Sequence, residues 1–226
     1  MKEYLGILGH ARLFAGVGTD EIQSMLSCLG AWQDTFRKGE YVCRAGEHLR
    51  SIMILAEGEL LLQKEDYWGN RSIISQVTPG EMFGEAYASP DSGPLLHDVA
   101  ATKDSTVIFF DLNRILSVCP SACRFHALTV QNLFFAISEK NRNLVAKLGH
   151  MANRSTRDKL LSYLSDEAKK RSSATFEIPF NRQQLADFLS VDRSAMSNEL
   201  SKMRADGLLT FEKNRFTLLQ HTPEMS

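Results

Sequence analysis

The first half of the chain consists of short apolar runs separated by polar corners, a pattern that predicts β-strands. Residues 51–63 are apolar on either side of a Gly-Glu corner, and residues 72–77 and 106–110 form further short apolar runs. Gly-Glu pairs begin or end apolar runs at five places, which are 39–40, 46–47, 58–59, 80–81 and 84–85. Glycine at such corners can adopt positive φ. After a helix predicted over 20–29, the pattern therefore indicates a compact antiparallel β-roll, similar to a jelly roll.

A long amphipathic helix is predicted after Pro120, because neither Gly nor Pro occurs again before Gly149. Its apolar positions and one Asn recur in steps of 4 and 3 residues and form a seam of Val130, Phe134, Ile137, Asn141, Leu144, Leu148 and Met151. Such a seam is typical of a two-stranded coiled coil, in which a polar Asn fixes the register. We therefore expect a parallel homodimer, with packing inside the chain as the alternative. Leu133 and Phe135, beside the seam, are expected to pack against the β-roll.

The last third of the chain predicts a small domain of helices with a β-hairpin at its end. Apolar spacing and turn residues predict, in order, helices over 157–169, 182–189 and 193–205 and a hairpin over 208–219. Asn181, with Gln184 three residues later, forms a capping-box sequence for the second helix, and Asp192 can cap the third. Two short helices joined by a tight turn and followed by a hairpin form a winged helix-turn-helix.

The residues of these two short helices resemble the C-terminal signature of the CRP/FNR superfamily of bacterial transcription regulators. Residues 182–200 read RQQLADFLSVDRSAMSNEL, and residues 204–209 read RADGLL. The Gly-Glu corners upstream are similar to the glycine framework of that family's cyclic-nucleotide-binding-type β-roll. The resulting expectation is an α+β chain with a β-roll sensor domain over 1–118, a long dimerisation helix over 119–152 and a winged helix-turn-helix DNA-binding domain over 153–226.

The resemblance implies a homodimer that binds a palindromic site in double-stranded DNA and is switched by an effector acting on the roll or the long helix. The second helix of the motif enters the major groove, so Arg193 at its start is the leading candidate for reading guanine. The residues expected to contact DNA are Arg182, Gln183, Asp192, Arg193, Ser194, Ser197, Asn198 and Lys202. Those expected to face inward are Ala195, Met196 and Leu200. Many family members carry Glu in place of Ser194 and Arg in place of Asn198, so their half-site is not transferred to this chain.

The segment after Glu85 departs from the family members that bind cyclic nucleotides. Those members hold the cyclic phosphate with an Arg and a hydroxyl residue about ten positions later, where this chain has Leu95 and Leu96. Neither Lys nor Arg occurs between 89 and 98, and a buried phosphate without a cation is unfavourable. Cyclic AMP and cyclic GMP are therefore not expected, no cofactor or metal is predicted, and the effector stays unidentified.

An apolar pocket for a small uncharged or weakly acidic molecule is the remaining hypothesis for the effector site. Its candidate walls are Phe83, Glu85, Tyr87, Leu95, Leu96 and Phe125, for which ordinary core packing is the alternative. Two further sensors stay open, a thiol switch formed by Cys119 and Cys123 and a haem ligated by His97 or His126. A roll that serves only protein interactions is another alternative. No enzyme is predicted, since the sequence lacks a phosphate loop, a nucleophile elbow and a metal-ligand cluster.

Composition and charge agree with this interpretation. The chain has 226 residues, of which 43% are hydrophobic and 23% charged, as in globular proteins. It has no apolar run of bilayer length and no signal peptide, so a cytoplasmic protein without membrane contact is expected. Lys and Arg number 14 against 10 Asp and Glu in residues 142–226, but 12 against 17 in residues 1–141. A basic C-terminal part suits contact with nucleic acid. RNA polymerase becomes a partner if the protein is an activator.

Overall fold

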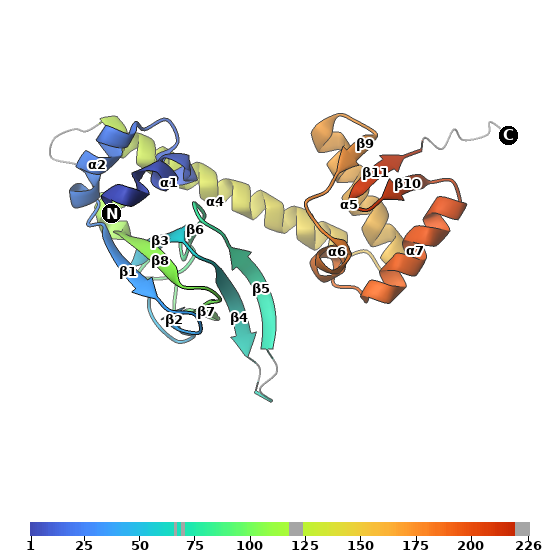
Figure 1. The fold of residues 1–226 in the computed structure, drawn as a ribbon, viewed down its shortest axis with the longest axis horizontal. Helices are drawn as coiled ribbons and strands as arrows, with labels where there is room; N and C mark the ends of the chain where they lie inside the picture. Colours follow the sequence, from blue (N-terminus) through green and yellow to red (C-terminus); the bar gives the residue numbers. More distant parts are fainter. Residues whose placement is uncertain (66, 69–70, 118–123, 220–226) are drawn as a thin grey trace. The chain divides into compact units, whose positions relative to one another are not determined.

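The computed structural model describes residues 1–65, 67–68, 71–117 and 124–219 of the chain. The chain divides into two compact units, residues 1–139 and 140–226. Figure 1 shows that each unit has sheets and helices of its own. The division falls inside the long helix α4 (Arg124–Met151), so the two ends of this helix belong to different units.

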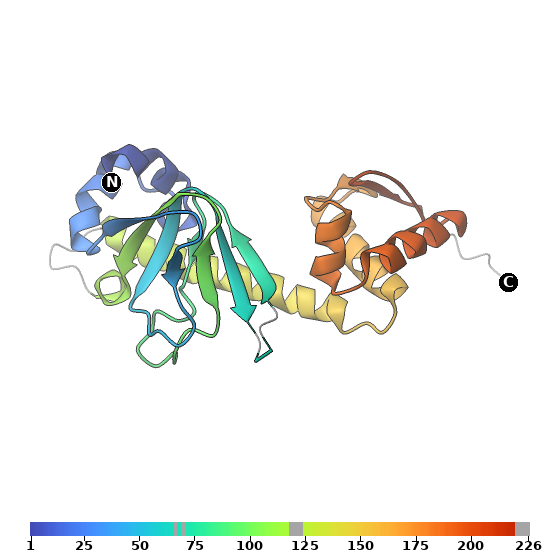
Figure 2. The same cartoon turned by 60° about the horizontal axis from the view of Figure 1, so that its bottom comes forward.

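The first unit is the β-roll, preceded by short helices. Its described elements, besides the first part of α4, are two 3₁₀ turns (Lys2–Tyr4 and Arg12–Phe14), α1 (Leu5–His10), α2 (Thr19–Cys28), β1 (Trp32–Phe36), β2 (Tyr41–Cys43), β3 (Ser51–Glu57), β4 (Leu60–Glu65), β5 (Arg71–Val77), β6 (Met82–Phe83), β7 (Asp98–Ala101), β8 (Ser105–Asp111) and α3 (Leu112–Leu116). The strands form two antiparallel sheets of four, in the orders β1-β8-β3-β6 and β2-β7-β4-β5 (Figure 2). The predicted antiparallel roll is confirmed.

Strand β3 is apolar at successive positions rather than at alternate ones, and the packing on its two faces explains this pattern. Successive side chains of a strand point to opposite faces of the sheet. Ile52 and Ile54 lie in a core shared with the N-terminal helices and α4, whereas Met53 and Leu55 lie in the core inside the roll. Both faces of β3 are therefore buried, and the strand has hydrophobic neighbours on each side.

The N-terminal segment contains more structure than the sequence pattern predicts. The helix expected over 20–29 is present as α2, but α1 and the two 3₁₀ turns precede it. Leu8, Leu13 and Phe14 from this segment are fully buried against the roll. Elements of three to six residues are too short to display a helical period, so only tertiary packing identifies them.

The first part of α4 packs on the roll through one face. Leu133 is buried there, as predicted. Buried Asn132 donates hydrogen bonds from Nδ2 to the carbonyl oxygens of Leu13, at 3.1 Å, and Ala15, at 2.8 Å, and so ties the helix to the N-terminal segment. The expectation that Phe135 also packs on the roll is wrong, because its side chain is 64% exposed. Phe135 follows Leu133 by two residues, which is about 200° around a helix, so it faces away from the roll.

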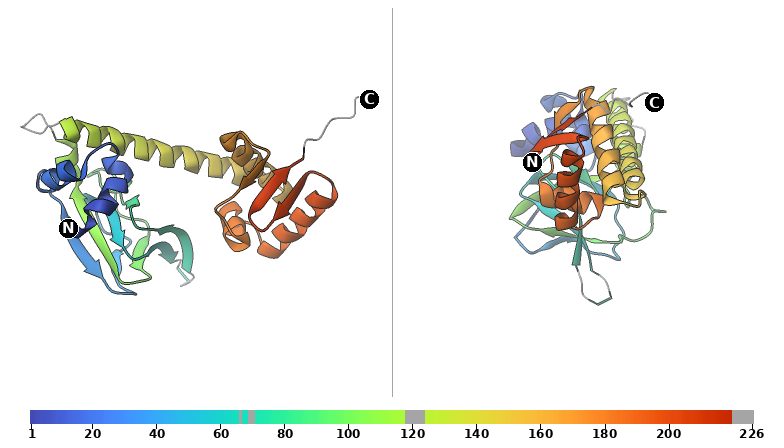
Figure 3. Two further views of the ribbon diagram at one scale, coloured as in Figure 1. Left: turned by 45° about the horizontal axis from the view of Figure 1, so that its top comes forward. Right: turned by 90° about the vertical axis from the view of Figure 1, so that its right-hand side faces the viewer.

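The C-terminal unit contains the predicted helices and hairpin, and the extended piece at 175–177 is a third strand beside the hairpin. Its described elements, besides the end of α4, are α5 (Thr156–Arg171), β9 (Thr175–Glu177), α6 (Arg182–Leu189), α7 (Arg193–Ala205), β10 (Leu209–Glu212) and β11 (Arg215–Leu218). The strands form one antiparallel sheet in the order β10-β11-β9, beside the three helices (Figure 3). Fully buried side chains from every helix, among them Leu164, Leu185 and Leu200, meet Phe216 of the sheet in one core. The winged helix-turn-helix is confirmed.

The Gly58 corner, between β3 and β4, is the tightest of the glycine corners in the roll. Gly58 has a φ of +95°, and a Cβ atom there would overlap Ser105 and the carbonyl oxygen of Asp104. The backbone N–H of Glu59 donates to Ser105 Oγ at 3.1 Å, which holds the corner against β8. Only glycine satisfies both the positive φ and the close approach.

We expect Gly58→Ala to destabilise the protein more than Gly39→Ala does. Both positions have positive φ, with Gly39 at +92°, but a Cβ at Gly39 meets no atom within 4 Å. Gly39→Ala should cost only the backbone strain, about 1–3 kcal/mol, whereas Gly58→Ala should add an overlap worth about 1–3 kcal/mol. Urea unfolding followed by circular dichroism measures both variants, and equal losses would contradict the role assigned to the Gly58 corner.

Candidate nucleic-acid interface

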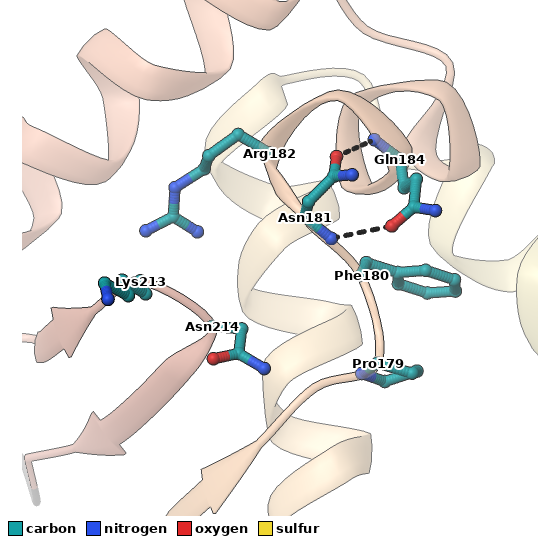
Figure 4. A pocket seen from close by; sticks show the side chains of 7 residues that line it. All are labelled: Pro179, Phe180, Asn181, Arg182, Gln184, Lys213 and Asn214. Atoms are coloured by element: carbon teal, nitrogen blue, oxygen red, sulfur yellow. Dashed lines mark hydrogen bonds between the residues drawn. The ribbon is translucent and has the colours of Figure 1, made fainter.

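Two side-chain caps determine where the helices of the helix-turn-helix begin. Asn181 Oδ1 accepts a hydrogen bond from the backbone N–H of Gln184 at 3.0 Å, and Gln184 Oε1 accepts one from the backbone N–H of Asn181 at 2.8 Å (Figure 4). Asp192 Oδ1 accepts from the backbone N–H of Ala195 at 2.7 Å. Ser190, in the left-handed conformation with φ of 51°, makes the turn between the helices. Both predicted caps are confirmed, and they place Arg182 and Arg193 in the first turns of α6 and α7.

Helix α7 presents a polar face on the surface of the C-terminal unit. The residues expected to contact DNA that are exposed on this helix are Arg193, Ser194, Asn198 and Lys202. Met196 and Leu200 are fully buried, as predicted, together with Met203. Ala195, which was expected to face inward, is exposed. The buried positions 196, 200 and 203 already complete a stripe with helical spacing, and 195 lies outside it.

Several of the predicted contact residues also have partners within the chain. Ser197 Oγ donates to the carbonyl oxygen of Arg193 at 2.9 Å, and Gln183 Nε2 donates to Asp187 Oδ1 at 2.9 Å. The Asp192 carboxylate, through its capping bond, holds the start of α7. A carboxylate at a helix N-terminus also interacts favourably with the helix dipole. The structure thus gives Asp192 a definite part in positioning Arg193.

Arg182 lies against the wing at the start of α6. Its guanidinium carbon is 4.7 Å from the ring centroid of Phe211 and 5.1 Å from that of Phe216. Burial lowers the pKa of Arg182, yet an arginine stays charged at neutral pH. Cation–π contacts of this kind restrict the guanidinium while leaving its N–H donors available. Arg182 is therefore a pre-positioned cation.

A cavity of about 460 Å³ opens beside Arg182, and Figure 4 shows the side chains around it. Its lining consists of Pro179, Phe180, Asn181, Arg182, Gln184, Lys213 and Asn214. Lys213, with φ of 51°, lies in the turn of the wing, and Asn214 Nδ2 donates to the carbonyl oxygen of Ile178 at 3.0 Å. Lys213 is not among the residues predicted to contact DNA, although its place in the polar turn between two hairpin strands is a signal that the sequence carries. Arg182 and Lys213 give this cavity two cations.

Arg157 connects α5 to both α7 and the turn that follows it. Its Nε lies 2.6 Å from Glu199 Oε1, and its Nη2 lies 2.5 Å from Asp206 Oδ2. Hydrogen bonds from a guanidinium to two carboxylates have a fixed geometry. The orientation of α7 within the unit therefore depends on Arg157 as well as on the apolar core.

The seam on α4 is largely exposed within one chain. The exposed fractions are 67% for Phe134, 42% for Ile137 and 56% each for Leu144 and Leu148. Asn141 is exposed among them, whereas Val130 packs partly against the core of the first unit and Met151 is half-buried. Neighbouring exposed apolar side chains on one helix mark an interaction surface.

The residues predicted to line an effector pocket come together only in part. Phe83 and Leu95 are buried inside the roll, and Tyr87 packs against the same core. Leu96 is 65% exposed, and Phe125 packs against the other core, beside the N-terminal helices. A pocket with walls of both Leu96 and Phe125 is therefore wrong. Both leucines lie in the loop before β7, where backbone hydrogen bonds of Leu95 with Gly46 and Glu47 hold this residue inside the roll and leave Leu96 on the surface.

Glu85 and the two histidines considered as sensors lie in different surroundings. Glu85 is half-buried, with its Oε2 atom shielded from solvent. The ring of His97 stands edge-on to Tyr87 with centroids 5.5 Å apart, and burial lowers the pKa of His97 while Asp98 opposes this shift. His126 is buried, with Nε2 2.7 Å from the carbonyl oxygen of Ile115, so this nitrogen is already engaged.

Two of the four cysteines, Cys28 and Cys43, lie among the described residues. Cys43 is buried, and burial, with the nearby charge of Glu47, raises the pKa of its thiol to about 12, which makes it unreactive. Cys28 is exposed. Cys119 and Cys123, the suggested thiol switch, lie outside the described residues. Within the ranges that the structure describes, no three His, Cys, Asp or Glu side chains are grouped as metal ligands.

Comparisons with known proteins agree with the two parts of the fold. The model of the cyclic nucleotide-binding domain family matches residues 33–121, and that of the Crp-like helix-turn-helix domain family matches residues 158–222, which together exceed half of the chain. The transcriptional activator protein FnrL of Cereibacter sphaeroides is 21% identical over 198 residues, covering 82% of this chain and 75% of FnrL. The cGMP-dependent protein kinase 2 of Mus musculus is 25% identical over 111 residues, covering 49% of this chain but 14% of the kinase.

Solved structures share the architecture at low sequence identity. The regulator CLP of Xanthomonas campestris, described as responsive to c-di-GMP, has a TM-score of 0.56 and 16% identity, with 88% of this chain and 98% of CLP covered. The catabolite activator protein of Thermus thermophilus has a TM-score of 0.50 and 18% identity, with 92% and 94% covered. These likenesses establish the fold.

A β-roll followed by a long helix and a winged helix-turn-helix defines a DNA-binding transcription regulator. The chain belongs to the CRP/FNR superfamily of bacterial transcription regulators. Among the described residues, no helix combines the length and the apolar character needed to cross a bilayer.

Proposed function

We propose that two copies of this chain pair through the seam on α4 and bind a palindromic operator, each with its own α7 in a major groove. The observation that carries this proposal is Arg193, exposed in the first turn of a capped helix whose opposite face is anchored in the core. A recognition helix contacts base edges through its N-terminal residues. Two copies related by a two-fold axis read the same half-site twice, which accounts for a palindrome.

Base reading and backbone positioning are assigned to different side chains. Arg193 suits guanine, because its guanidinium can donate to O6 and N7 together, and exposed Asn198 suits adenine in the same way. Ser194 is exposed next to Arg193 and can bond to either type of base edge. Arg182 and Lys213, on the same cavity, are proposed to contact phosphates, which fixes the register without reading sequence.

The proposed dimer is supported by the exposure of the seam. Phe134, Leu144 and Leu148 are each more than half exposed, and burying them against a second α4 would remove this apolar surface from water. The spacing of 4 and 3 residues continues through Asn141, where an Asn pair specifies two strands in register. Lys140 and Lys147 directly precede the seam positions Asn141 and Leu148 and would lie at the edge of such an interface.

The signal that controls this regulator is proposed to be something other than a cyclic nucleotide. Leu95 is buried where the nucleotide-binding relatives of the family carry a cation, and its backbone pairs with Gly46 and Glu47 at 2.8 Å in both directions. The segment from 89 to 98 contributes no Lys or Arg. An anionic phosphate placed there would lose its hydration without gaining an ion pair. The effector itself is left open, and contact with RNA polymerase is proposed only for a promoter at which the protein activates.

Arg193→Ala should abolish sequence discrimination at one base pair of each half-site. Loss of a bidentate arginine–guanine contact costs about 1–3 kcal/mol per half-site. Arg193→Lys is the matched control, since it keeps the charge but not the planar fork, and should retain binding to unrelated DNA. Selection of binding sites from a random library, followed by anisotropy titrations over a range of salt, measures both. Unchanged affinity and salt dependence for Arg193→Ala would refute the proposal.

Replacing Leu144 and Leu148 with Glu should convert the dimer to a monomer. Four carboxylates would then face each other across the seam without partners, which is strongly unfavourable. Arg142→Glu, an acidic change at an exposed position outside the seam, is the control and should remain dimeric. Sedimentation velocity gives the mass of each variant. A double variant that sediments as the native protein does would exclude the seam as the interface.

Cyclic AMP and cyclic GMP should neither bind the protein nor change its affinity for the selected operator. Isothermal titration calorimetry tests the binding, and the same operator titration with saturating nucleotide tests the coupling. The physical reason is the missing cation between 89 and 98. Micromolar binding of either nucleotide would overturn this part of the proposal and leave the DNA-binding part unaffected.

A further inference from the structure

The last turn of α4 is anchored inside the C-terminal unit by a buried histidine. His150 is 3% exposed, and its Nδ1 lies 2.9 Å from Ser162 Oγ on α5. Its Nε2 lies 3.9 Å from Asp166 Oδ2, which is beyond hydrogen-bond distance. The His150 ring stands edge-on to Tyr163, with centroids 5.7 Å apart and an interplanar angle of 84°.

Aromatic side chains extend this anchor from α5 to α6. The ring of Phe188 on α6 lies 5.3 Å from Tyr163 and 6.5 Å from His150. Phe180, just before α6, lies 4.9 Å from Phe188. Lys147, one turn before His150 on α4, has its Nζ 5.2 Å from the Phe188 centroid. The end of α4 is therefore held against both α5 and α6 by polar and aromatic contacts.

This anchor connects the seam to the DNA-reading helix within one unit. Leu144 and Leu148 of the seam precede His150 by six and two residues on the same helix. Helix α6 carries Phe188, whose ring lies near His150, and it packs directly on α7. An α-helix is stiff over two turns, so the angle at His150 fixes the direction in which α7 stands relative to Leu144 and Leu148.

We propose that neutral His150 is the joint that sets the spacing and orientation of the two recognition helices in the dimer, and that its protonation loosens this joint. The inference rests on the proposed dimer and deepens it, because it names the residue that couples the subunit interface to the operator. His150 touches no DNA in this proposal and acts as a positioning residue.

The charges around His150 determine the direction of its response to pH. On α5 it faces Asp166, Glu167, Tyr163 and Lys170, and on α4 Lys147 is close, while α6 presents the uncharged Phe188. Burial lowers the pKa of His150 and Lys170 lowers it further, against the opposing effects of Asp166 and Glu167. Glu167 is itself paired with Lys170 and Arg171 at 3.1 and 3.2 Å. Near neutral pH the imidazole is therefore uncharged.

The sign of the linkage follows from this lowered pKa. Neutral His150 contributes its full effect to operator affinity above the pKa of a free histidine, about 6.5. The contribution declines as the pH falls from that value toward the lowered pKa of the joint. Within this window, operator affinity should fall by up to about tenfold per subunit for each pH unit.

The test uses the full-length protein and the symmetric operator obtained by selection. Operators with one base pair added or removed between the half-sites, and a single isolated half-site, are titrated between pH 7.5 and 5.5. The native protein should prefer one spacing and lose that preference on acidification. His150→Asn, which keeps a polar group near Ser162 Oγ but cannot titrate, should show a flat pH profile. His150→Ala should bind all spacings alike while keeping its affinity for the half-site.

The controls separate this inference from the function on which it rests. His97→Asn removes a half-buried histidine of the β-roll whose pKa is also lowered, and it should leave the profile unchanged. Ser162→Ala removes the hydrogen bond to His150 but keeps the titrating ring. This variant tests the joint even if His150→Ala fails to fold. If His150→Asn and Ser162→Ala both keep the native spacing preference and the native pH profile, the proposed joint at His150 is refuted. Absence of any symmetric operator for the native protein would instead overturn the proposed function.

Discussion

The structure depends on one helix that must be apolar on two sides. Along α4, Leu133 and Ala136 complete the core of the β-roll, while Phe134, Ile137, Leu144 and Leu148 remain exposed on another face. Burial of the first face orders the helix against the roll, with Asn132 fixing the N-terminal segment to it. The second face has no such role within the chain and is unfavourable in water. The proposed dimer resolves this conflict.

The C-terminal unit shows how a small core can present a polar helix in a defined orientation. The buried face of α7, formed by Met196, Leu200 and Met203, packs in the core of the unit. The Asp192 cap fixes where the helix starts, and Arg157 holds it through Glu199 and Asp206. Arg193 is therefore placed on a rigid element rather than on a loop, which favours specific recognition over general attraction to DNA. The His150 joint extends this rigidity to the end of α4.

The β-roll has kept the framework of a cyclic-nucleotide-binding domain while its interior is filled by its own side chains. Met53, Leu55, Phe83 and Leu95 share one apolar core, and the loop that brings Leu95 inward carries no cation. The match to the cyclic nucleotide-binding family thus describes backbone architecture. Ligand chemistry depends on individual side chains, and the proposal of a signal other than a cyclic nucleotide rests on those between 89 and 98.

The sequence alone determined what local chemistry decides: the short apolar strands and their glycine corners, the two caps at Asn181 and Asp192, the inward positions 196 and 200 of α7 and the repeat along α4. These follow from backbone periodicity and short-range hydrogen bonds, so one segment carries all the information. Tertiary structure decided the rest. It buried Leu8 of α1, turned Phe135 and Leu96 outward, separated Phe125 from Phe83, brought Lys213 beside Arg182 and enclosed His150. Each of these depends on contacts between residues far apart in the chain, and a hydrophobic pattern records that a side chain is buried but not which neighbour buries it.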